Sequence, residues 1–164
     1  MLIDVNVVLD FVLDRPRFAE DASALWASAE RKEIEAVVPA HGVTTVFHLA
    51  RRQGGPALAR RVVSDLLAVS GVAAVDAAVL RRALALGWRD FEDAVCAAAA
   101  EAAGCDTLVT RDPEGYPGCS IVVVDPSTAV SLLRPGPGPG EVAERPSSTP
   151  RRRRAAPSRS ARRR

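Results

Sequence analysis

The strongest constraint on the fold comes from two short apolar runs in the second half of the chain, DTLVT at 106–110 and SIVVVD at 120–125. Both are rich in β-branched residues, a composition typical of parallel strands that are buried on both faces. Two further apolar runs, at 2–4 and 36–40, lie among helical patterns. Strands that alternate with helices form βαβ units, so the sequence predicts a three-layer α/β/α sandwich around a central parallel sheet.

Helical patterns fill most of the chain between these strands. Arg15-Pro16 should end the first helix, because the residue before a proline is pushed out of helical geometry. Gly54-Gly55 followed by Pro56 should separate two consecutive helices. The expected helices are 6–13, 18–31, 42–55, 56–69, 77–86, 91–103 and 127–133, and the segment 72–76 is either a small strand or an extended connection.

Charge divides the chain into two parts. Of its 22 lysines and arginines, nine arginines lie in 135–164, against only two of its 20 acidic residues. Residues 1–134 therefore hold 13 basic and 18 acidic side chains, a net charge of −5. The segment 135–164 begins PGPGPG and ends in an arginine-rich stretch that lacks large apolar residues. We predict a folded acidic domain at 1–134 and a disordered basic tail, which either grips nucleic acid or an acidic partner or is a solvated extension.

The cysteines point to a reducing compartment. Cys96, Cys105 and Cys119 are odd in number and lack CxxC spacing, which argues against a disulfide framework or a zinc site. Cys96 lies in an alanine-rich helical run, where we expect a small buried residue. The opening residues show no signal-peptide pattern, and no run approaches the roughly 20 apolar residues of a membrane span. A cytoplasmic protein without membrane association is therefore expected.

Acidic residues occur where the predicted strands end. Asp4 ends the first strand, Asp112 follows the strand at 106–110, and Asp93 lies at the start of the helix that leads into that strand. Ligands of open α/β sheets bind at the carboxyl ends of the strands. The three carboxylates therefore meet at one edge if the loop before Asp93 crosses there.

Each acidic residue also has a purely structural interpretation. Asp4 and Asp90 are suitable helix N-caps, because an aspartate there accepts hydrogen bonds from free amides. Asp93, three residues after Asp90, stands in the capping-box position. Asp112 precedes Pro113 and could simply open a turn.

The recurrence of these carboxylates favours a metal site. Gathering several like charges costs energy unless something cationic joins them. All candidate ligands are oxygens, and His41 and His48 lie away from the acidic motifs in the sequence, so Mg²⁺ or Mn²⁺ is expected rather than zinc. Such sites activate water and stabilise charge on a phosphodiester, and no phosphate loop or dinucleotide fingerprint is present. The sequence thus predicts metal-dependent phosphodiester hydrolysis.

Two other acid-based chemistries fail on a required residue. A haloacid-dehalogenase-type phosphatase needs a second aspartate two residues after the first, where this chain has Asn6. A receiver domain needs a lysine after a late strand, and the only lysine here is Lys32, in an early polar turn.

Three segments carry a resemblance to a known family: LIDVNVVLDFVLDRP, DFEDAVCAAAAEAAGCDTLVTRDPEGY and IVVVDPSTAV. In this order and spacing they resemble a PIN-domain protein of the VapC-like toxin group, over roughly residues 1–133. The resemblance implies a PIN-like fold and an Mg²⁺- or Mn²⁺-dependent ribonuclease. It further implies RNA as substrate, a small cognate antitoxin as partner, and a possible homodimer.

The resemblance also assigns roles to residues. Asp4, Asp93 and Asp112 match three acidic catalytic and metal-site positions, and Asn6 matches the small polar residue that commonly supports the first aspartate. Glu92 is a weaker supporting candidate, and so are Asp90, which is chiefly a helix cap, and Thr45.

One position departs from the family pattern. Family members usually carry a glutamate in the helix after the second strand, where this chain has GVTTVFHLARR, with Thr44, Thr45 or His48 near the place. Losing a carboxylate should weaken metal binding: either Glu92 partly substitutes, or one metal suffices, or activity is low. The alternative function is a catalytically weak PIN fold that acts as an RNA- or protein-binding module.

The basic and aromatic residues give only a loose indication of RNA binding. Arg51, Arg52 and Arg111 are candidate RNA contacts, although a helical arginine pair ordinarily lies on a solvated face. Trp26 and Trp88 are expected in the core or at a partner contact, since aromatic residues make up only 4% of the chain and form no stacking surface.

Overall fold

The computed structural model describes residues 1–133. Its five strands form one sheet in the order β3-β2-β1-β4-β5, and every neighbouring pair is parallel. The predicted parallel sheet is confirmed. The strands are β1 (Leu2–Ile3), β2 (Val37–Pro39), β3 (Gly71–Ala73), β4 (Thr107–Val109) and β5 (Val122–Val124).

The helices lie close to their predicted positions. In α3, Gly54 and Gly55 leave helical geometry, and Gly55 has a φ of +80°, which a residue with a side chain rarely adopts. The predicted break between two helices is thus present as a kink. The helical elements are α1 (Val5–Val12), α2 (Ala19–Glu30), α3 (Ala40–Val69), α4 (Ala77–Leu86), α5 (Phe91–Ala102), the 3₁₀ turn η1 (Pro113–Gly115) and α6 (Pro126–Leu133).

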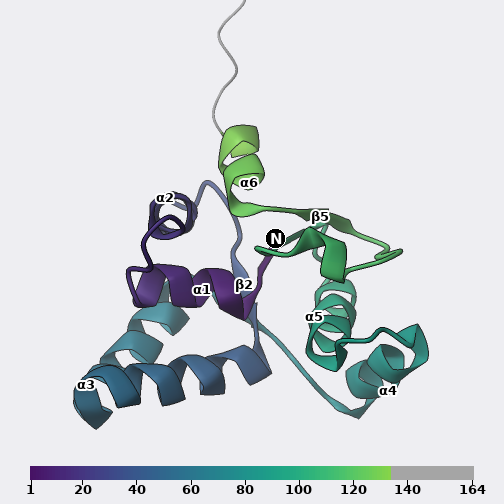
Figure 1. The fold of residues 1–164 in the computed structure, drawn as a ribbon, viewed down its shortest axis with the longest axis horizontal. Coiled ribbons are helices and arrows are strands. Elements are labelled where there is room, and N and C mark those ends of the chain that lie inside the picture. The colour runs from purple at the N-terminus through teal and green to yellow at the C-terminus, as the bar shows by residue number, and fades with distance from the viewer. Residues whose placement is uncertain (134–164) are drawn as a thin grey trace, which may run out of the picture. The chain divides into compact units, whose positions relative to one another are not determined.

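The sheet separates two hydrophobic cores, because successive residues of a strand point to opposite faces. In β1, Leu2 packs with residues of α4 and α5, whereas Ile3 packs with residues of α1, α2, α3 and α6. Leu108 and Val109 of β4 divide in the same way. Figure 1 shows α1, α2 and α3 to the left of β2 and α4 and α5 to its right. Helices on both faces complete the predicted α/β/α sandwich.

Small side chains let α5 pack tightly between the sheet and α4. Residues 94–100 are all buried, and five of these seven are alanines. Alanine combines the highest helix propensity with a side chain that permits close approach on every side of the helix. The other two are Val95, 5% exposed, and Cys96, 1% exposed as expected. This packing holds the first turn of α5 in a fixed place relative to the sheet.

One strand differs from the prediction. The run at 120–125 was expected to be buried on both faces, but β5 is the last strand of the sheet and Val122 is 60% exposed. Val123 and Val124 pack against the two opposite cores. A β-branched run suits an edge strand as well as a central one, so sequence pattern alone does not separate the two.

The strand order creates a switch point at β1. From β1 the chain runs to β2 on one side, and it later returns to β4 on the other side. The crevice outside the carboxyl ends of two such strands is where open α/β sheets bind ligands. The segments after β1 and β4 are therefore the first place to look for a site.

None of the helices among residues 1–133 is both long and apolar enough to cross a membrane. The predicted disordered tail at 135–164 lies outside the described residues.

Candidate active site

Asp4 sits at the end of β1, held by the strand beside it. Its backbone N–H donates to the carbonyl of Val109 in β4 at 2.9 Å, and the residue is only 5% exposed. Asp4 precedes α1, but its side chain makes no capping hydrogen bond to that helix. The structural alternative for this carboxylate therefore fails, and its hydrogen bonds lead elsewhere.

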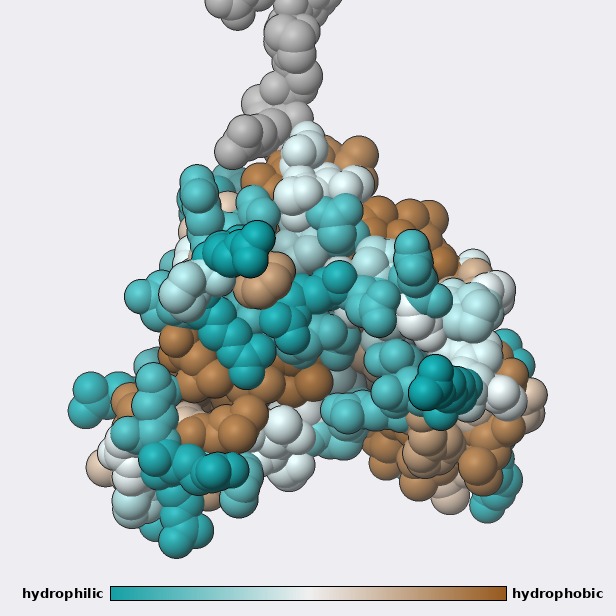
Figure 2. Space-filling model, viewed as in Figure 1, coloured by the Kyte–Doolittle hydropathy of each residue, from teal (hydrophilic) through white to brown (hydrophobic). Residues whose placement is uncertain are grey.

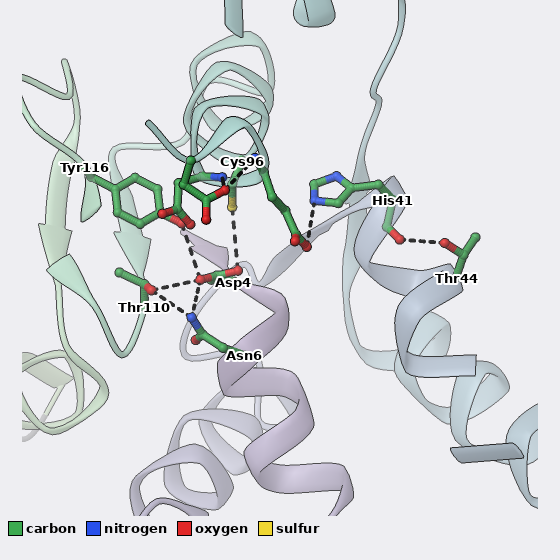
Figure 3. Close-up of polar contacts among 10 residues, drawn as sticks. Asp4, Asn6, His41, Thr44, Cys96, Thr110 and Tyr116 are labelled. Atoms are coloured by element: carbon green, nitrogen blue, oxygen red, sulfur yellow. Dashed lines mark hydrogen bonds and ion pairs between the residues drawn. The ribbon is translucent and has the colours of Figure 1, made fainter. Parts of the chain in front are cut away.

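Neutral donors surround the Asp4 carboxylate (Figure 3). Oδ2 accepts hydrogen bonds from the Asn6 amide, from the Thr110 hydroxyl at 2.8 Å and from the Tyr116 hydroxyl at 3.3 Å. Burial raises the pKa of Asp4, and these hydrogen bonds only partly oppose it. None of these donors carries a positive charge. The buried Asp4 carboxylate therefore has no cationic hydrogen-bond partner among residues 1–133.

Asn6 and Thr110 tie the start of α1 to the turn after β4. The Asn6 amide donates to Thr110 Oγ1 at 3.1 Å, and Asn6 Oδ1 accepts from the backbone N–H of Arg111 at 3.3 Å. Thr110 Oγ1 also accepts from the backbone N–H of Asp112 at 3.3 Å. The same network therefore fixes the backbone on either side of the switch point.

The first turn of α5 brings in the second candidate. The Asp90 side chain accepts from the backbone N–H groups of Glu92 at 2.8 Å and Asp93 at 3.3 Å, as predicted for an N-cap. Partial burial raises the pKa of Asp93 to about 6, with further contributions from the negative charges of Asp90, Asp4 and Asp112. The loop before α5 therefore does cross near the strand ends, and the three predicted acids share one electrostatic environment.

Gly115 separates two of these carboxylates. A Cβ placed on Gly115 would lie 2.8 Å from Asp93 Oδ2 and 3.5 Å from Asp112 Oδ2. Asp112 precedes η1, but its side chain makes no capping hydrogen bond. The carboxylates of Asp93 and Asp112 thus converge on a space that the missing side chain leaves open.

A cleft of about 560 Å³ opens beside these two carboxylates. Its lining carries four carboxylates and one guanidinium, together with an indole. Asp4, which is 5% exposed, does not line this cleft. The lining residues are Trp88, Arg89, Asp90, Asp93, Asp112, Glu114, Gly115 and Pro117.

The donor chemistry of the site fits a hard divalent cation. Asp4, Asp93 and Asp112 offer only carboxylate oxygens, the ligands that Mg²⁺ and Mn²⁺ favour. Among residues 1–133, however, no three His, Cys, Asp or Glu side chains are already arranged to hold a metal ion. Asp4 in particular directs Oδ2 at its three hydrogen-bond donors. A metal held by all three of these residues would therefore require their side chains to move.

His41 is far from the acidic motifs in the sequence but lies near one of them in the structure. Its Nε2 lies 3.8 Å from Glu92 Oε1 (Figure 3), because α3 begins directly after β2 at the same edge of the sheet. Near the position of the missing family glutamate, the Thr44 hydroxyl donates to the His41 carbonyl at 2.7 Å. Thr45 is half-buried and His48 exposed. The sequence separation of about 50 residues hid the proximity of His41 to Glu92.

The three candidate RNA-binding arginines occupy different places. Arg51 and Arg52 are exposed on α3, about 15 Å further along the helix than His41 at 1.5 Å per residue. The Arg111 guanidinium is turned toward α1, where Nε lies 3.3 Å from Asp10 Oδ2.

The two tryptophans also separate. Trp26 is a core residue, 5% exposed, as expected. Trp88 packs edge-on against Tyr116, with ring centroids 5.7 Å apart, and also lines the acidic cleft. Trp88 therefore makes the expected core contact, and it also borders the cleft.

Sequence reasoning missed two groups of the site. Thr110 is the last residue of the DTLVT run and Tyr116 is the only tyrosine of the chain, yet no periodicity brings either back to Asp4. Both are buried, with exposures of 0% and 4%. Cys96 is buried as expected. The sequence did not predict that its Sγ lies 4.0 Å from Asp4 Oδ1. Burial, and next the charge of Asp4, raise the pKa of this thiol.

The sequence matches the PIN domain family over residues 1–114, and the chain belongs to that family. No curated protein sequence matches it.

Solved structures of similar fold come from toxin–antitoxin systems. Mycobacterium tuberculosis VapC20, a Sarcin-Ricin loop cleaving toxin, is 21% identical with a TM-score of 0.54, over 65% of this chain and 85% of that one. A toxin–antitoxin complex from Klebsiella pneumoniae is 20% identical with a TM-score of 0.58, over 76% and 96%. VapBC2 from Rickettsia felis, bound to a DNA fragment from its promoter, is 12% identical with a TM-score of 0.58, over 76% and 98%. At these identities the likeness concerns the fold.

Proposed function

We propose that this protein is an Mg²⁺- or Mn²⁺-dependent endoribonuclease and the toxin of a toxin–antitoxin pair. The observation that carries the proposal is the convergence of Asp4, Asp93 and Asp112 at the switch point between β1 and β4. Their mutual repulsion contributes to raising the pKa of Asp93 to about 6. A carboxylate cluster of this kind gains stability from a bound divalent cation.

In this proposal Asp4, Asp93 and Asp112 hold the metal. A divalent ion at such a site lowers the pKa of water and neutralises charge that develops on the phosphate. Asn6, Thr110 and Tyr116 fix the orientation of the Asp4 carboxylate through their hydrogen bonds. Outer partners of this kind commonly change metal affinity by about 10- to 100-fold.

The cleft offers RNA a route to the carboxylates. Trp88 presents an aromatic surface and Arg89 a guanidinium beside Asp93 and Asp112. Unpaired bases of RNA stack on aromatic rings, and guanidinium groups pair with phosphates. The four acidic side chains of the lining repel a phosphate backbone unless cations are present, so substrate binding should itself require the metal.

A small antitoxin is the proposed partner. Structures of similar fold include toxin–antitoxin complexes from Klebsiella pneumoniae and Rickettsia felis. The charge of −5 on residues 1–134 favours a partner with a basic contact surface. Pairing of two copies of this chain remains an expectation from the resemblance. Co-expression with the product of any short reading frame encoded beside this chain, followed by co-purification, tests the partnership.

The test of the enzymatic function combines Mn²⁺ titration calorimetry with cleavage of a structured RNA, on the full chain and on the Asp4→Asn/Asp93→Asn variant. We expect metal binding and EDTA-sensitive cleavage in the wild type, and the loss of both in the variant. Circular dichroism shows whether the variant is folded. Cleavage that persists in EDTA, or that the variant retains, would contradict the proposal.

Two observations favour a second function. Residues 1–133 contain no preformed three-ligand metal site, and the helix after β2 presents Thr44, Thr45 and His48 where the resemblance leads us to expect a glutamate. Both features suit a PIN fold that binds RNA or protein with little or no catalysis. Saturable RNA binding without cleavage at millimolar Mn²⁺ would establish this function instead.

A further inference from the structure

A second buried carboxylate lies on α1, outside the cluster just described. Asp10 is completely buried, yet its neighbours Val8 and Leu9 are the apolar residues expected in a core helix. Two arginines reach it from two different loops. Arg15 Nη1 donates to Asp10 Oδ1 at 3.4 Å, and Arg111 Nε lies 3.3 Å from Asp10 Oδ2.

A buried ion pair is a costly way to fill a core position. Removing a carboxylate from water costs several kcal/mol, and an apolar residue of similar size is often at least as stable. Moreover, Oδ2 of Asp10 has no hydrogen-bond partner among residues 1–133, because the nearby Arg111 Nε–H does not point at it. Stability of the fold alone does not explain this arrangement.

The Arg111 side chain is held on two sides. Its guanidinium carbon lies 5.0 Å from the ring centroid of Phe18, in the connection between α1 and α2, while Nε faces Asp10. Such a cation–π contact favours one position of the guanidinium. Only 31% of the side chain is exposed, so Arg111 behaves as a fixed link between β4 and α1.

The backbone of Arg111 belongs to the candidate active site. Its N–H donates to Asn6 Oδ1, and the next residue is Asp112. The N–H of Asp112 in turn donates to Thr110 Oγ1, which also donates to Asp4. Two sets of contacts therefore hold the turn that carries Asp112. Asn6 and Thr110 bind its backbone through neutral hydrogen bonds, and the Arg111 side chain contacts Asp10.

We propose that Asp10 and Arg111 are positioning residues of the metal site. Their ion pair holds the turn after β4 so that the Asp112 carboxylate faces Asp93. Arg15 binds the same carboxylate but belongs to the connection between α1 and α2, so it balances the charge of Asp10 without holding Asp112. The inference rests on the proposed metal-dependent function and adds residues that neither the acidic motifs nor the resemblance indicated.

Arg111 could instead act directly on the RNA phosphate, as the sequence first suggested. The two roles differ in what they change. A positioning role affects Mn²⁺ affinity and is overcome by a higher Mn²⁺ concentration. A direct phosphate contact affects the KM for RNA and leaves Mn²⁺ affinity unchanged.

The experiment compares Arg111→Met with its matched control Arg15→Met in the full chain. Both variants remove one guanidinium from Asp10, and their side chains are exposed to a similar extent, 31% and 35%. We expect Arg111→Met to weaken Mn²⁺ binding about 10-fold or more, as for other outer partners of metal sites, and Arg15→Met to change it less than about 3-fold. RNA cleavage by Arg111→Met should recover when Mn²⁺ is raised. Arg111→Lys, which keeps the charge but lacks the fork geometry, should restore part of the affinity.

Equal Mn²⁺ affinities in Arg111→Met and the wild type would overturn the inference, and so would an equal loss in both arginine variants. A loss confined to the KM for RNA would favour the direct phosphate contact. If Arg111→Met does not fold, Arg111→Lys serves as the test, and wild-type affinity in that variant would also count against positioning. A wild type that binds no Mn²⁺ would instead overturn the proposed function itself, so the two failures are distinguishable.

Discussion

Asp4 and Asp10 lie six residues apart, and both carboxylates are almost completely removed from water, with exposures of 5% and 0%. Their surroundings differ in charge. Asp4 accepts hydrogen bonds from an amide and two hydroxyls, whereas Asp10 lies against the guanidinium groups of Arg15 and Arg111.

The Asp4 carboxylate therefore still needs a cation, whereas the Asp10 carboxylate already has two guanidinium groups beside it. Hydrogen bonds from neutral groups do not fully offset the burial of Asp4, so its pKa is raised. The negative charge left at the end of β1 is what a divalent ion would compensate. Asp10 has its compensating charges within the chain, and its role is to hold the structure around the site.

Replacing each carboxylate by its amide gives the largest expected contrast. Asp4→Asn should weaken Mn²⁺ binding by more than about 100-fold, yet leave the stability of the metal-free protein unchanged or higher, because a desolvated charge is removed. Asp10→Asn should destabilise the fold by about 3 kcal/mol, since it leaves two arginines without their partner. Urea denaturation in EDTA and Mn²⁺ calorimetry measure the two effects.

Reversed effects of Asp4→Asn and Asp10→Asn on stability would contradict the roles assigned to these two carboxylates. A large destabilisation in Asp4→Asn would mean that this carboxylate is a structural residue like Asp10. A stable Asp10→Asn variant would mean that Arg15 and Arg111 remain sufficiently hydrated without it.

The pH dependence of stability should reveal Asp93. Its pKa of about 6 in the folded protein lies above the value of about 3.9 for an unfolded chain, so the folded state binds the proton more tightly. Stability of the metal-free protein should therefore fall as pH rises from about 4 to about 6. Mn²⁺ affinity should rise through the same region and then level off, because the metal must displace the proton.

Asp93→Asn isolates this contribution from that of Asp4, whose pKa is also raised. Denaturation of both proteins in EDTA between about pH 4 and 8 should show a shallower decline in the variant. Parallel curves would mean that Asp93 is an ordinary exposed carboxylate.

Thr110→Val tests whether buried hydrogen bonds to Asp4 matter more than similar bonds at the surface. The change removes a donor to Asp4 and an acceptor for two neighbouring groups. We expect a loss of about 1–2 kcal/mol and about a 10-fold weaker Mn²⁺ affinity. The matched control is Thr128→Val. The Thr128 hydroxyl donates to Asp125 at 2.7 Å in an exposed hydrogen bond, and hydrogen bonds lower the pKa of Asp125 to about 2. Equal effects in the two variants would contradict a special role for the buried network.

Gly115→Ala should give the smallest effect. The added methyl group would lie 2.8 Å from Asp93 Oδ2, so the Asp93 carboxylate must rotate away while the backbone stays in place. The melting temperature should change by no more than a few degrees, and Mn²⁺ affinity should fall about 3- to 10-fold. Gly118→Ala is not a suitable control because its φ of +68° adds strain. Unchanged affinity in Gly115→Ala would mean that Asp93 and the metal do not share this space.

Much of the fold was predictable because its signals are local. The kink at Gly54-Gly55, the Asp90 cap and the β-branched strands depend on residues close together in the chain. The edge position of β5 was not predictable, since strand order depends on contacts across the whole sheet. Of the candidate site, the three carboxylates could be named from their place after strands and at a helix start, but their hydrogen-bond partners could not.

The sequence by itself determined the order of most elements, the difference in charge between residues 1–134 and 135–164, and the oxygen-only character of the candidate ligands. Only the tertiary structure decided which buried carboxylate has a cation and which lacks one. Asp4 and Asp10 look alike in the sequence because both interrupt the same apolar run. Their charges are balanced, or left unbalanced, by residues about 100 positions later, Thr110, Arg111 and Tyr116, which only the packing of β4 against β1 brings near.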